Sequence, residues 1–236
     1  VLDRGITCIE TFDYDIVDQI YAPYDNLGLN VILHGNGSRE YKVLGSLAEA
    51  LKAQSSDSAQ WNRLKNVFSS KSLQLVSFTI TEKGYALHRA DGTWLPYVQK
   101  DIQNGPDSPT GAMAVLTAML YERYKAGKYP LALLSLDNCS QNGHKLRQSV
   151  LTMSKEWQQQ GFVPDSFVSY VSDESIVAFP WSMIDKITPR PSEQIAADLE
   201  ALGVKNMQPV ITGKKTYIAP FVNAEKPQYL VIEDTF

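Results

Sequence analysis

Polar side chains gather where a predicted buried strand gives way to a predicted helix. The apolar run at 131–136 has the length of a strand and is followed by Asp137, Asn138, Ser140, Asn142 and Gly143. An amphipathic helical pattern then covers 144–160. Ligands of open α/β sheets bind at the carboxyl ends of the strands, so these carboxylate and amide groups are candidates for holding a ligand. The alternative is that they only cap the helix and close a turn.

The elements that must position these groups alternate between strands and helices. Predicted strands cover 5–10, 29–33, 41–44, 73–80, 131–136, 209–212, 216–222 and 228–232. Predicted helices cover 46–53, 58–68, 109–126, 144–160, a segment after Asp13 that ends before Pro23, and a segment that Ser192 caps and Gly203 closes. Residues 86–107 are predicted loop, and the turn at 35–38 indicates a hairpin. This order predicts an α/β fold with a mostly parallel sheet, helices on both faces and an inserted hairpin.

Composition excludes several classes of protein. The chain has 236 residues, of which 44% are hydrophobic, and a net charge of −4, which argues against a nucleic-acid surface. It has no apolar run of the roughly 20 residues that a membrane span needs, and no signal-peptide pattern. Two cysteines, Cys8 and Cys139, suggest reduced thiols in the cytoplasm. His34, His88 and His144 lie far apart, so no metal site is expected.

Four ordered motifs resemble the mannitol dehydrogenase family, the long-chain, metal-independent polyol and hexuronate dehydrogenases. They are Ser135-Leu-Asp-Asn-x-x-x-Asn-Gly143, Phe179-Pro-x-Ser-Met-Ile-Asp-Lys-Ile-Thr-Pro189, Thr79-Ile-Thr-Glu-Lys-Gly-Tyr85 and Tyr229-Leu-Val-Ile-Glu-Asp-Thr-Phe236. The resemblance covers nearly the whole chain. Within the family, the stretch 10–26 most resembles the branch that interconverts D-mannonate and D-fructuronate.

The resemblance implies a Rossmann-like domain that binds NAD, and hydride transfer between NAD and a sugar acid or polyol. It gives Asn138 an oxyanion role, because a neutral amide stabilises the charge that develops on a ketone oxygen during reduction. It also suggests that Asp185 contacts the cofactor; a surface ion pair with Lys186 or Arg190 is the alternative reading. Asp137, Asn142 and Gly143 are expected to be structural.

Further cofactor contacts are expected at two strand ends. Glu10 ends the first predicted strand, where a carboxylate bonds the ribose 2′-hydroxyl and selects NAD over NADP. Asp13 is the second candidate, because it is equally well explained as a helix cap. Thr81 and Glu82 follow the strand 73–80 and are expected to lie over the middle of the dinucleotide. Lys83 is the alternative candidate for a catalytic base, whereas the resemblance implies a lysine outside this chain.

The resemblance also implies two segments that this chain is expected to lack. No strand, glycine-rich turn and helix precede Gly5, so the first βα unit of the fold is expected to be missing. The family's mainly helical second domain, with the catalytic lysine, would follow Phe236. We therefore expect 1–236 to be one NAD-binding domain, truncated at both ends and inactive alone.

The sequence leaves several alternative functions open. Mannitol oxidation and altronate oxidation, the reverse of tagaturonate reduction, are close to the D-mannonate reaction. A different class is a non-catalytic nucleotide-binding or partner-docking module. Oligomeric state is not predicted. The leading hypothesis requires Glu10 and Asn138 to project from the same rim of the sheet and flank one nucleotide cleft.

Overall fold

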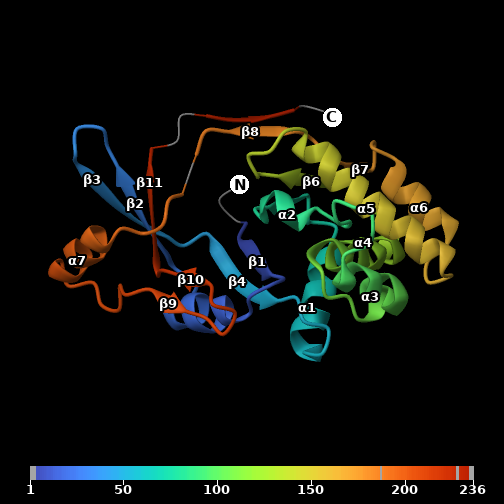
Figure 1. Cartoon of the computed structure of the whole chain (residues 1–236), viewed down its shortest axis with the longest axis horizontal. Coiled ribbons are helices and arrows are strands. Elements are labelled where there is room, and N and C mark those ends of the chain that lie inside the picture. Colours follow the sequence, from blue (N-terminus) through green and yellow to red (C-terminus); the bar gives the residue numbers. More distant parts are fainter. Residues whose placement is uncertain (1–3, 187, 227–228, 234–236) are drawn as a thin grey trace. The chain divides into compact units, whose positions relative to one another are not determined.

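The computed structural model describes residues 4–186, 188–226 and 229–233, and the chain divides into two compact units. Unit 1 comprises Val1–Lys52 and Asp185–Tyr229, and unit 2 comprises Ala53–Ile184 and Leu230–Phe236 (Figure 1). Each unit has its own strands and helices, and each is described here by itself. No helix within the described ranges is long and apolar enough to cross a membrane.

Unit 2 is built on a parallel sheet of three strands. Strand β6 (Leu131–Ser135) lies between β5 (Leu75–Phe78) and β7 (Val177–Ala178), and both pairings are parallel. Every residue of β6 is buried, which explains its unbroken apolar run, because a central parallel strand is covered on both faces.

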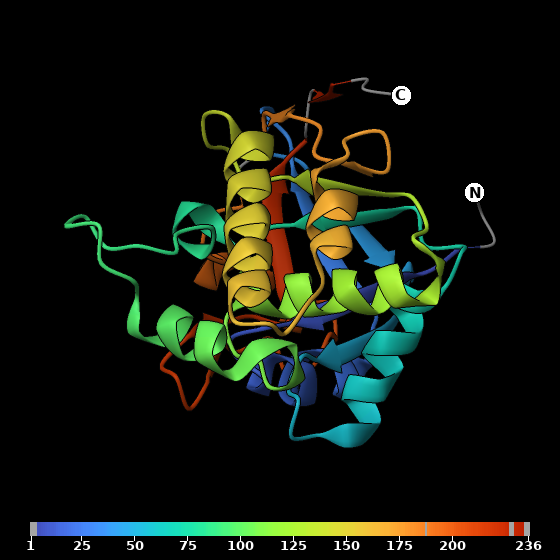
Figure 2. The same cartoon turned by 90° about the vertical axis from the view of Figure 1, so that its right-hand side faces the viewer.

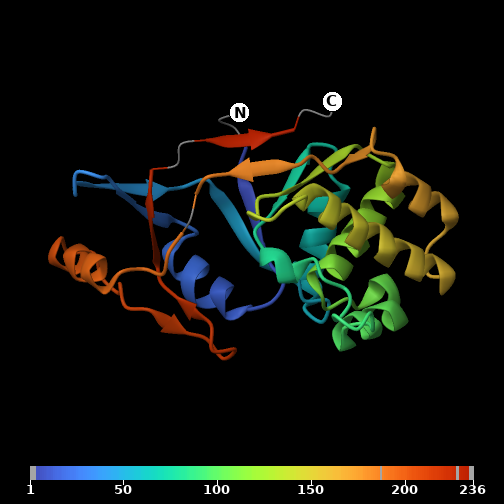
Figure 3. The same cartoon turned by 45° about the horizontal axis from the view of Figure 1, so that its top comes forward.

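Helices and a short ribbon complete unit 2. The helices are α1 (Ser58–Ser69), α2 (Thr81–Gly84), α3 (Pro96–Asn104), α4 (Ala112–Gly127), α5 (Asn142–Gln159) and α6 (Asp165–Ser172), with a 3-10 turn η3 (Gly105–Asp107). Helix α4 is buried on all sides along 113–120, and α5 and α6 pack side by side (Figure 2). Strand β8 (Ser182–Ile184) pairs antiparallel with β12 (Leu230–Ile232) and forms a separate two-stranded ribbon (Figure 3).

A buried arginine joins the segments that enter the sheet of unit 2. Arg123, on α4, is fully buried, and its guanidinium donates to five backbone carbonyls at 2.7–2.9 Å: those of Phe68, Ser70, Leu73, Tyr129 and Pro130. These carbonyls lie at the end of α1 and just before β5 and β6. The side chain therefore satisfies backbone groups that would otherwise be buried without partners.

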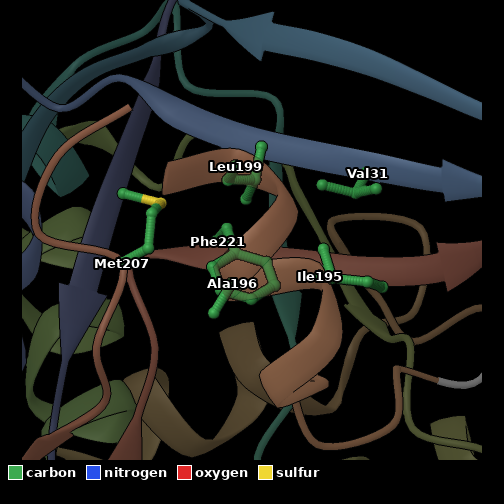
Figure 4. Close-up of a cluster of buried hydrophobic side chains, with 6 residues drawn as sticks. All are labelled: Val31, Ile195, Ala196, Leu199, Met207 and Phe221. Atoms are coloured by element: carbon green, nitrogen blue, oxygen red, sulfur yellow. The ribbon is translucent and has the colours of Figure 1, made fainter. Parts of the chain in front are cut away.

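Unit 1 contains three small sheets and one α-helix among its described residues. Strand β2 (Gly28–Leu33) pairs antiparallel with β3 (Arg39–Leu44) and parallel with β11 (Phe221–Glu225). Strand β1 (Ile6–Glu10) pairs parallel with β4 (Leu47–Lys52), and β9 (Val210–Ile211) pairs antiparallel with β10 (Tyr217–Ile218). Helix α7 (Glu193–Ala201) packs on β2 and β11 through the core cluster Val31, Ile195, Ala196, Leu199, Met207 and Phe221 (Figure 4).

Most predicted elements are present, but the strand predicted over 216–222 is two strands, β10 and β11, and three further predictions are wrong. The predicted helix at 46–53 is the strand β4, because pairing with β1 outweighs the helix propensity of its Leu, Ala, Glu and Lys residues. The predicted loop 86–107 contains α3, which starts at Pro96 and buries Val98 and Ile102. The helical segment after Asp13 is a π-helical turn, η1 (Val17–Tyr21), that continues across Pro23 as a 3-10 turn, η2 (Ala22–Tyr24).

Candidate functional site

The carboxyl ends of β5 and β6 lie side by side in unit 2. Phe78 pairs with Ser135 at the end of the ladder, and the N–H of Leu136 donates to the carbonyl of Phe78 at 2.8 Å. The loops that follow the two strands are therefore neighbours, and they carry Thr81, Glu82, Asp137 and Asn138. The structure brings these four predicted residues to one edge of one sheet.

Asp137 ties the two loops together. Its Oδ2 accepts the N–H of Ile80 at 3.0 Å, and its Oδ1 accepts the N–H of Thr81 at 2.9 Å. The hydroxyl of Tyr85 donates to Oδ2 at 2.5 Å and also lies 2.7 Å from Oγ of Ser135. Both carboxylate oxygens are thus engaged inside the protein, which confirms the expected structural role of Asp137.

Thr81 has a strained backbone at this edge. Its φ is +61°, in the left-handed region that a β-branched residue rarely adopts. Such a conformation costs about 1–3 kcal/mol and persists only where the surroundings impose it. Here the hydrogen bond from its N–H to Asp137 supplies that constraint. Strain of this kind clusters at ligand clamps and active sites, and the role of Thr81 toward a cofactor stays a prediction.

Glu82 forms an ion pair with Lys145, which lies on the first turns of α5. The Glu82 carboxylate is exposed, and its hydrogen bond to Lys145 raises the pKa of that lysine above its ordinary value. An open groove of about 690 Å³ adjoins this pair, lined by Glu82, Tyr85, Ala86, Leu87, His88, Lys145, Gln148, Ser149, Leu151, Thr152 and Lys155. A cofactor contact by Glu82 would compete with Lys145, and that contact stays a prediction.

Asn138 presents a free amide beside this network. The residue is exposed, and its side chain has no hydrogen-bond partner among the residues that the structure describes. Its neighbour Asp137 is held through its side chain and through its carbonyl, which accepts the N–H of Cys139 at 2.8 Å and Nδ2 of Asn142 at 3.1 Å. An unpaired amide on a fixed backbone can donate to a ligand oxygen.

Asn142 docks the segment after β7 onto the start of α5. Its Nδ2 donates to the carbonyl of Ser182 at 3.0 Å, and its Oδ1 accepts the N–H of Ser182 at 3.1 Å. Gly143 is required beside it, because a Cβ there would lie 2.4 Å from the carbonyl oxygen of Phe179. The expected structural roles of Asn142 and Gly143 are confirmed, and the sequence did not predict the contact of Asn142 with Ser182.

Asp185 follows β8, and its Oδ1 accepts the N–H of Tyr229 at 3.2 Å. The carboxylate thus braces the backbone just before β12. The sequence had suggested either a cofactor contact or a surface ion pair for Asp185, and this backbone contact is a third role. Its cofactor role stays a prediction.

Glu10 and Asp13 lie together in unit 1. Glu10 ends β1, is half-buried, and accepts through Oε1 the N–H groups of Phe12 at 2.8 Å and Asp13 at 3.2 Å. Asp13 is buried, and its Oδ2 accepts the hydroxyl of Thr212 at 2.5 Å. Both carboxylates therefore stabilise the turn that follows β1. Their cofactor roles, and the common cleft with Asn138, stay predictions, because Asn138 belongs to unit 2.

Burial raises the pKa of the Asp13 carboxyl, but hydrogen bonds from Thr212, Thr216 and the N–H of Asp15 outweigh it, together with the charge of Lys214. The net effect is a pKa below the ordinary value, so Asp13 is an ionised structural group at neutral pH. The turn 212–216 also donates the N–H of Gly213 to Asp15 Oδ2 at 2.8 Å. Within the described ranges, no three His, Cys, Asp or Glu side chains are arranged to hold a metal ion.

Residues 5–235 match the family described as the mannitol dehydrogenase Rossmann domain. The chain belongs to this family. A D-mannonate oxidoreductase of Thermotoga maritima is 51% identical over 234 residues, which are 99% of this chain and 43% of that protein. The D-mannonate oxidoreductase of Escherichia coli is 28% identical over 174 residues, which are 72% of this chain and 33% of that protein. The chain thus spans less than half the length of these relatives.

Two solved structures of sugar-alcohol dehydrogenases share the fold of this mannitol dehydrogenase family member. A D-sorbitol dehydrogenase in substrate-free form has a TM-score of 0.77, with 98% of this chain and 44% of that chain covered. The mannitol 2-dehydrogenase of Pseudomonas fluorescens, in a ternary complex with NAD and D-mannitol, has a TM-score of 0.71, with 98% and 49% covered. Both are 23% identical to this chain. The expected Rossmann-like α/β fold is confirmed.

Proposed function

We propose that the natural polypeptide carrying this sequence is an NAD-dependent oxidoreductase that interconverts D-mannonate and D-fructuronate. The observation that carries the reaction class is the exposed, unpaired amide of Asn138 beside the fixed Asp137 at the carboxyl edge of the β5–β6 pair. The choice of substrate is supported by the 51% identity to a D-mannonate oxidoreductase across 99% of the chain.

In this proposal Asn138 stabilises charge on the substrate. Reduction of the ketone of D-fructuronate places negative charge on the carbonyl oxygen, and a neutral amide N–H aimed at that oxygen stabilises it without giving up a proton. NAD, when bound, supplies or accepts the hydride. The hydrogen bonds that fix Asp137, the residue before Asn138, support this role, because preorganised donors stabilise a transition state with little further ordering.

The leading cofactor contact in this proposal is Glu10. Glu10 accepts from the ribose 2′-hydroxyl, as expected for a carboxylate at the end of such a strand, and its negative charge disfavours the 2′-phosphate of NADP. Asp13, Thr81, Glu82 and Asp185 are the further candidates. We rank Asp13 below Glu10, because Asp13 is the more deeply buried and holds Thr212.

The proposal extends to the rest of the polypeptide. The chain spans 43% of the T. maritima relative, and we infer that the general acid–base group and the residues gripping the sugar acid lie outside these 236 residues. The 236-residue chain alone is then expected to show no turnover. Measurable consumption of NADH by this chain would contradict that expectation and favour Lys83, which is exposed.

The experiment has two stages. Calorimetry with NAD and with NADP tests for cofactor binding and its selectivity. Oxidation of NADH is then followed with D-fructuronate, D-fructose and D-tagaturonate, which separates the D-mannonate reaction from mannitol and altronate oxidation. Binding of NAD without turnover by the natural polypeptide would favour a nucleotide-binding module, and the absence of both would contradict the proposal.

A further inference from the structure

The loop after β5 is attached to the β6–α5 segment at several points. Asp137 holds the N–H groups of Ile80 and Thr81, and the ion pair with Lys145 holds Glu82. The hydroxyl of Ser149, on α5, donates to the carbonyl of Tyr85 at 2.7 Å. Displacement of either segment would therefore break contacts with the other.

Tyr85 adds a contact from its side chain to the end of β6 and to the loop that follows it. Its hydroxyl lies 2.5 Å from Asp137 Oδ2 and 2.7 Å from Ser135 Oγ. Asp137 as a carboxylate can only accept, so Tyr85 donates to Asp137 and accepts from Ser135. Burial, followed by the hydrogen bond to Asp137, raises the pKa of Tyr85 above its ordinary value, so the hydroxyl keeps its proton. The result is a chain of hydrogen bonds from Ser135 through Tyr85 to Asp137.

We propose that Tyr85 and Asp137 act as positioning residues that fix the backbone presenting Asn138 to the substrate. This inference rests on the oxyanion role proposed for Asn138. The Asn138 side chain has no partner of its own among the described residues, so the hydrogen bonds of its neighbour Asp137 hold the backbone from which the amide projects. Three donors hold the Asp137 carboxylate, and Asn142 Nδ2 holds its carbonyl. Neither Tyr85 nor Asp137 needs to touch the substrate.

The test is a double-mutant cycle in the natural polypeptide. Tyr85→Phe removes one hydroxyl and keeps the ring, so the fold should persist. We expect kcat to fall about tenfold, because a small misplacement of a catalytic group is costly, while KM and the Kd for NAD stay within about twofold. In an Asn138→Ala background the same change should have no further effect, because it acts through Asn138.

Hydrogen–deuterium exchange of the peptide 79–85 gives a readout that does not depend on activity. Tyr85→Phe should accelerate exchange there, and Asp137→Asn should accelerate it more, because the amide offers only one acceptor oxygen where the carboxylate accepts from both Ile80 and Thr81. Tyr124→Phe is the matched control: it removes a hydroxyl that lies 2.6 Å from Ser166 Oγ, and it should leave kcat and this exchange unchanged.

The outcomes separate the two claims. Multiplicative effects of Tyr85→Phe and Asn138→Ala, or unchanged exchange at 79–85, would overturn the positioning role while leaving the oxyanion role intact. An unchanged kcat for Asn138→Ala alone would refute the oxyanion role and the catalytic half of this inference. Exchange would still decide whether Tyr85 and Asp137 hold the loop.

Discussion

Asn142 and Ser182 are hydrogen-bonded in both directions, at 3.0 Å from Nδ2 to the Ser182 carbonyl and at 3.1 Å from the Ser182 N–H to Oδ1. The two residues are 40 positions apart and belong to the two longest family motifs. The two motifs meet at this pair in the folded chain: one supplies the amide and the other the backbone that it binds. These hydrogen bonds therefore connect the start of α5 to the start of β8.

Replacement of Asn142 by alanine should destabilise the protein. Asn142 is buried, and its loss would leave the N–H and carbonyl of Ser182 without this partner. We expect the free energy of unfolding to fall by about 2 kcal/mol, the usual cost of unpaired buried groups. Urea denaturation measures this. Asn62→Ala, at an exposed position of α1, is the control, and an equal effect of both changes would contradict the role given to Asn142.

Arg123→Lys should be more damaging than a conservative change normally is. An ammonium group cannot reproduce a planar fork that reaches five carbonyls, so several buried carbonyls would lose their donors. We expect a loss of about 3 kcal/mol in the free energy of unfolding. The urea midpoint reports it, with Arg89→Lys at an exposed position as the control. Retention of wild-type stability would show that the carbonyls find other partners.

The stability of unit 1 should depend on the ionisation of Asp13. Its pKa in the folded state lies below the ordinary value of 3.8: burial raises it, but hydrogen bonds from Thr212, Thr216 and the N–H of Asp15, with the charge of Lys214, together outweigh burial. The stabilisation is then fully present above the ordinary value and is lost as the pH falls through the folded pKa. The free energy of unfolding, measured as a function of pH, should fall less steeply below about pH 4 in Asp13→Asn than in the wild type. If the free energy of unfolding falls equally steeply in both proteins, Asp13 does not make this contribution.

Glu10 offers a test of cofactor selection. Glu10→Gln removes the negative charge that is proposed to disfavour a 2′-phosphate, while it keeps the size of the side chain. We expect the preference for NAD over NADP, measured by calorimetry, to fall by about tenfold. Glu225→Gln, at an exposed position of β11, should not change the preference. If Glu10→Gln leaves the ratio unchanged, another residue selects the cofactor.

Local patterns predicted much of the fold. The apolar run of β6 and the helical spacing in α5 are strong signals, and the turn at 35–38 specified the β2–β3 hairpin. Strand β4 was missed because only its pairing with β1, far away in sequence, makes it a strand. Helix α3 was missed because turn signals flank a short apolar pattern.

The site was predicted less completely than the fold. The polar cluster at 137–143 lies at the carboxyl end of β6, as predicted, because both its strand and its helix are visible in the sequence. The contact of Tyr85 with Asp137 spans 52 residues, and no local pattern indicates it. Likewise the hydroxyl of Thr212 that holds Asp13 lies 199 residues away, so Asp13 resembled a helix cap rather than part of a tertiary contact.

The central claim is the oxyanion role of Asn138, and the most direct measurement compares turnover with cofactor affinity. In the natural polypeptide, Asn138→Ala should lower kcat with D-fructuronate by about 10²-fold or more, the usual effect of losing one such donor. The Kd for NAD, measured by calorimetry, should change by less than about threefold, because the amide is proposed to act on the substrate. A wild-type kcat, or a loss of NAD binding that accounts for the whole defect, would contradict the claim.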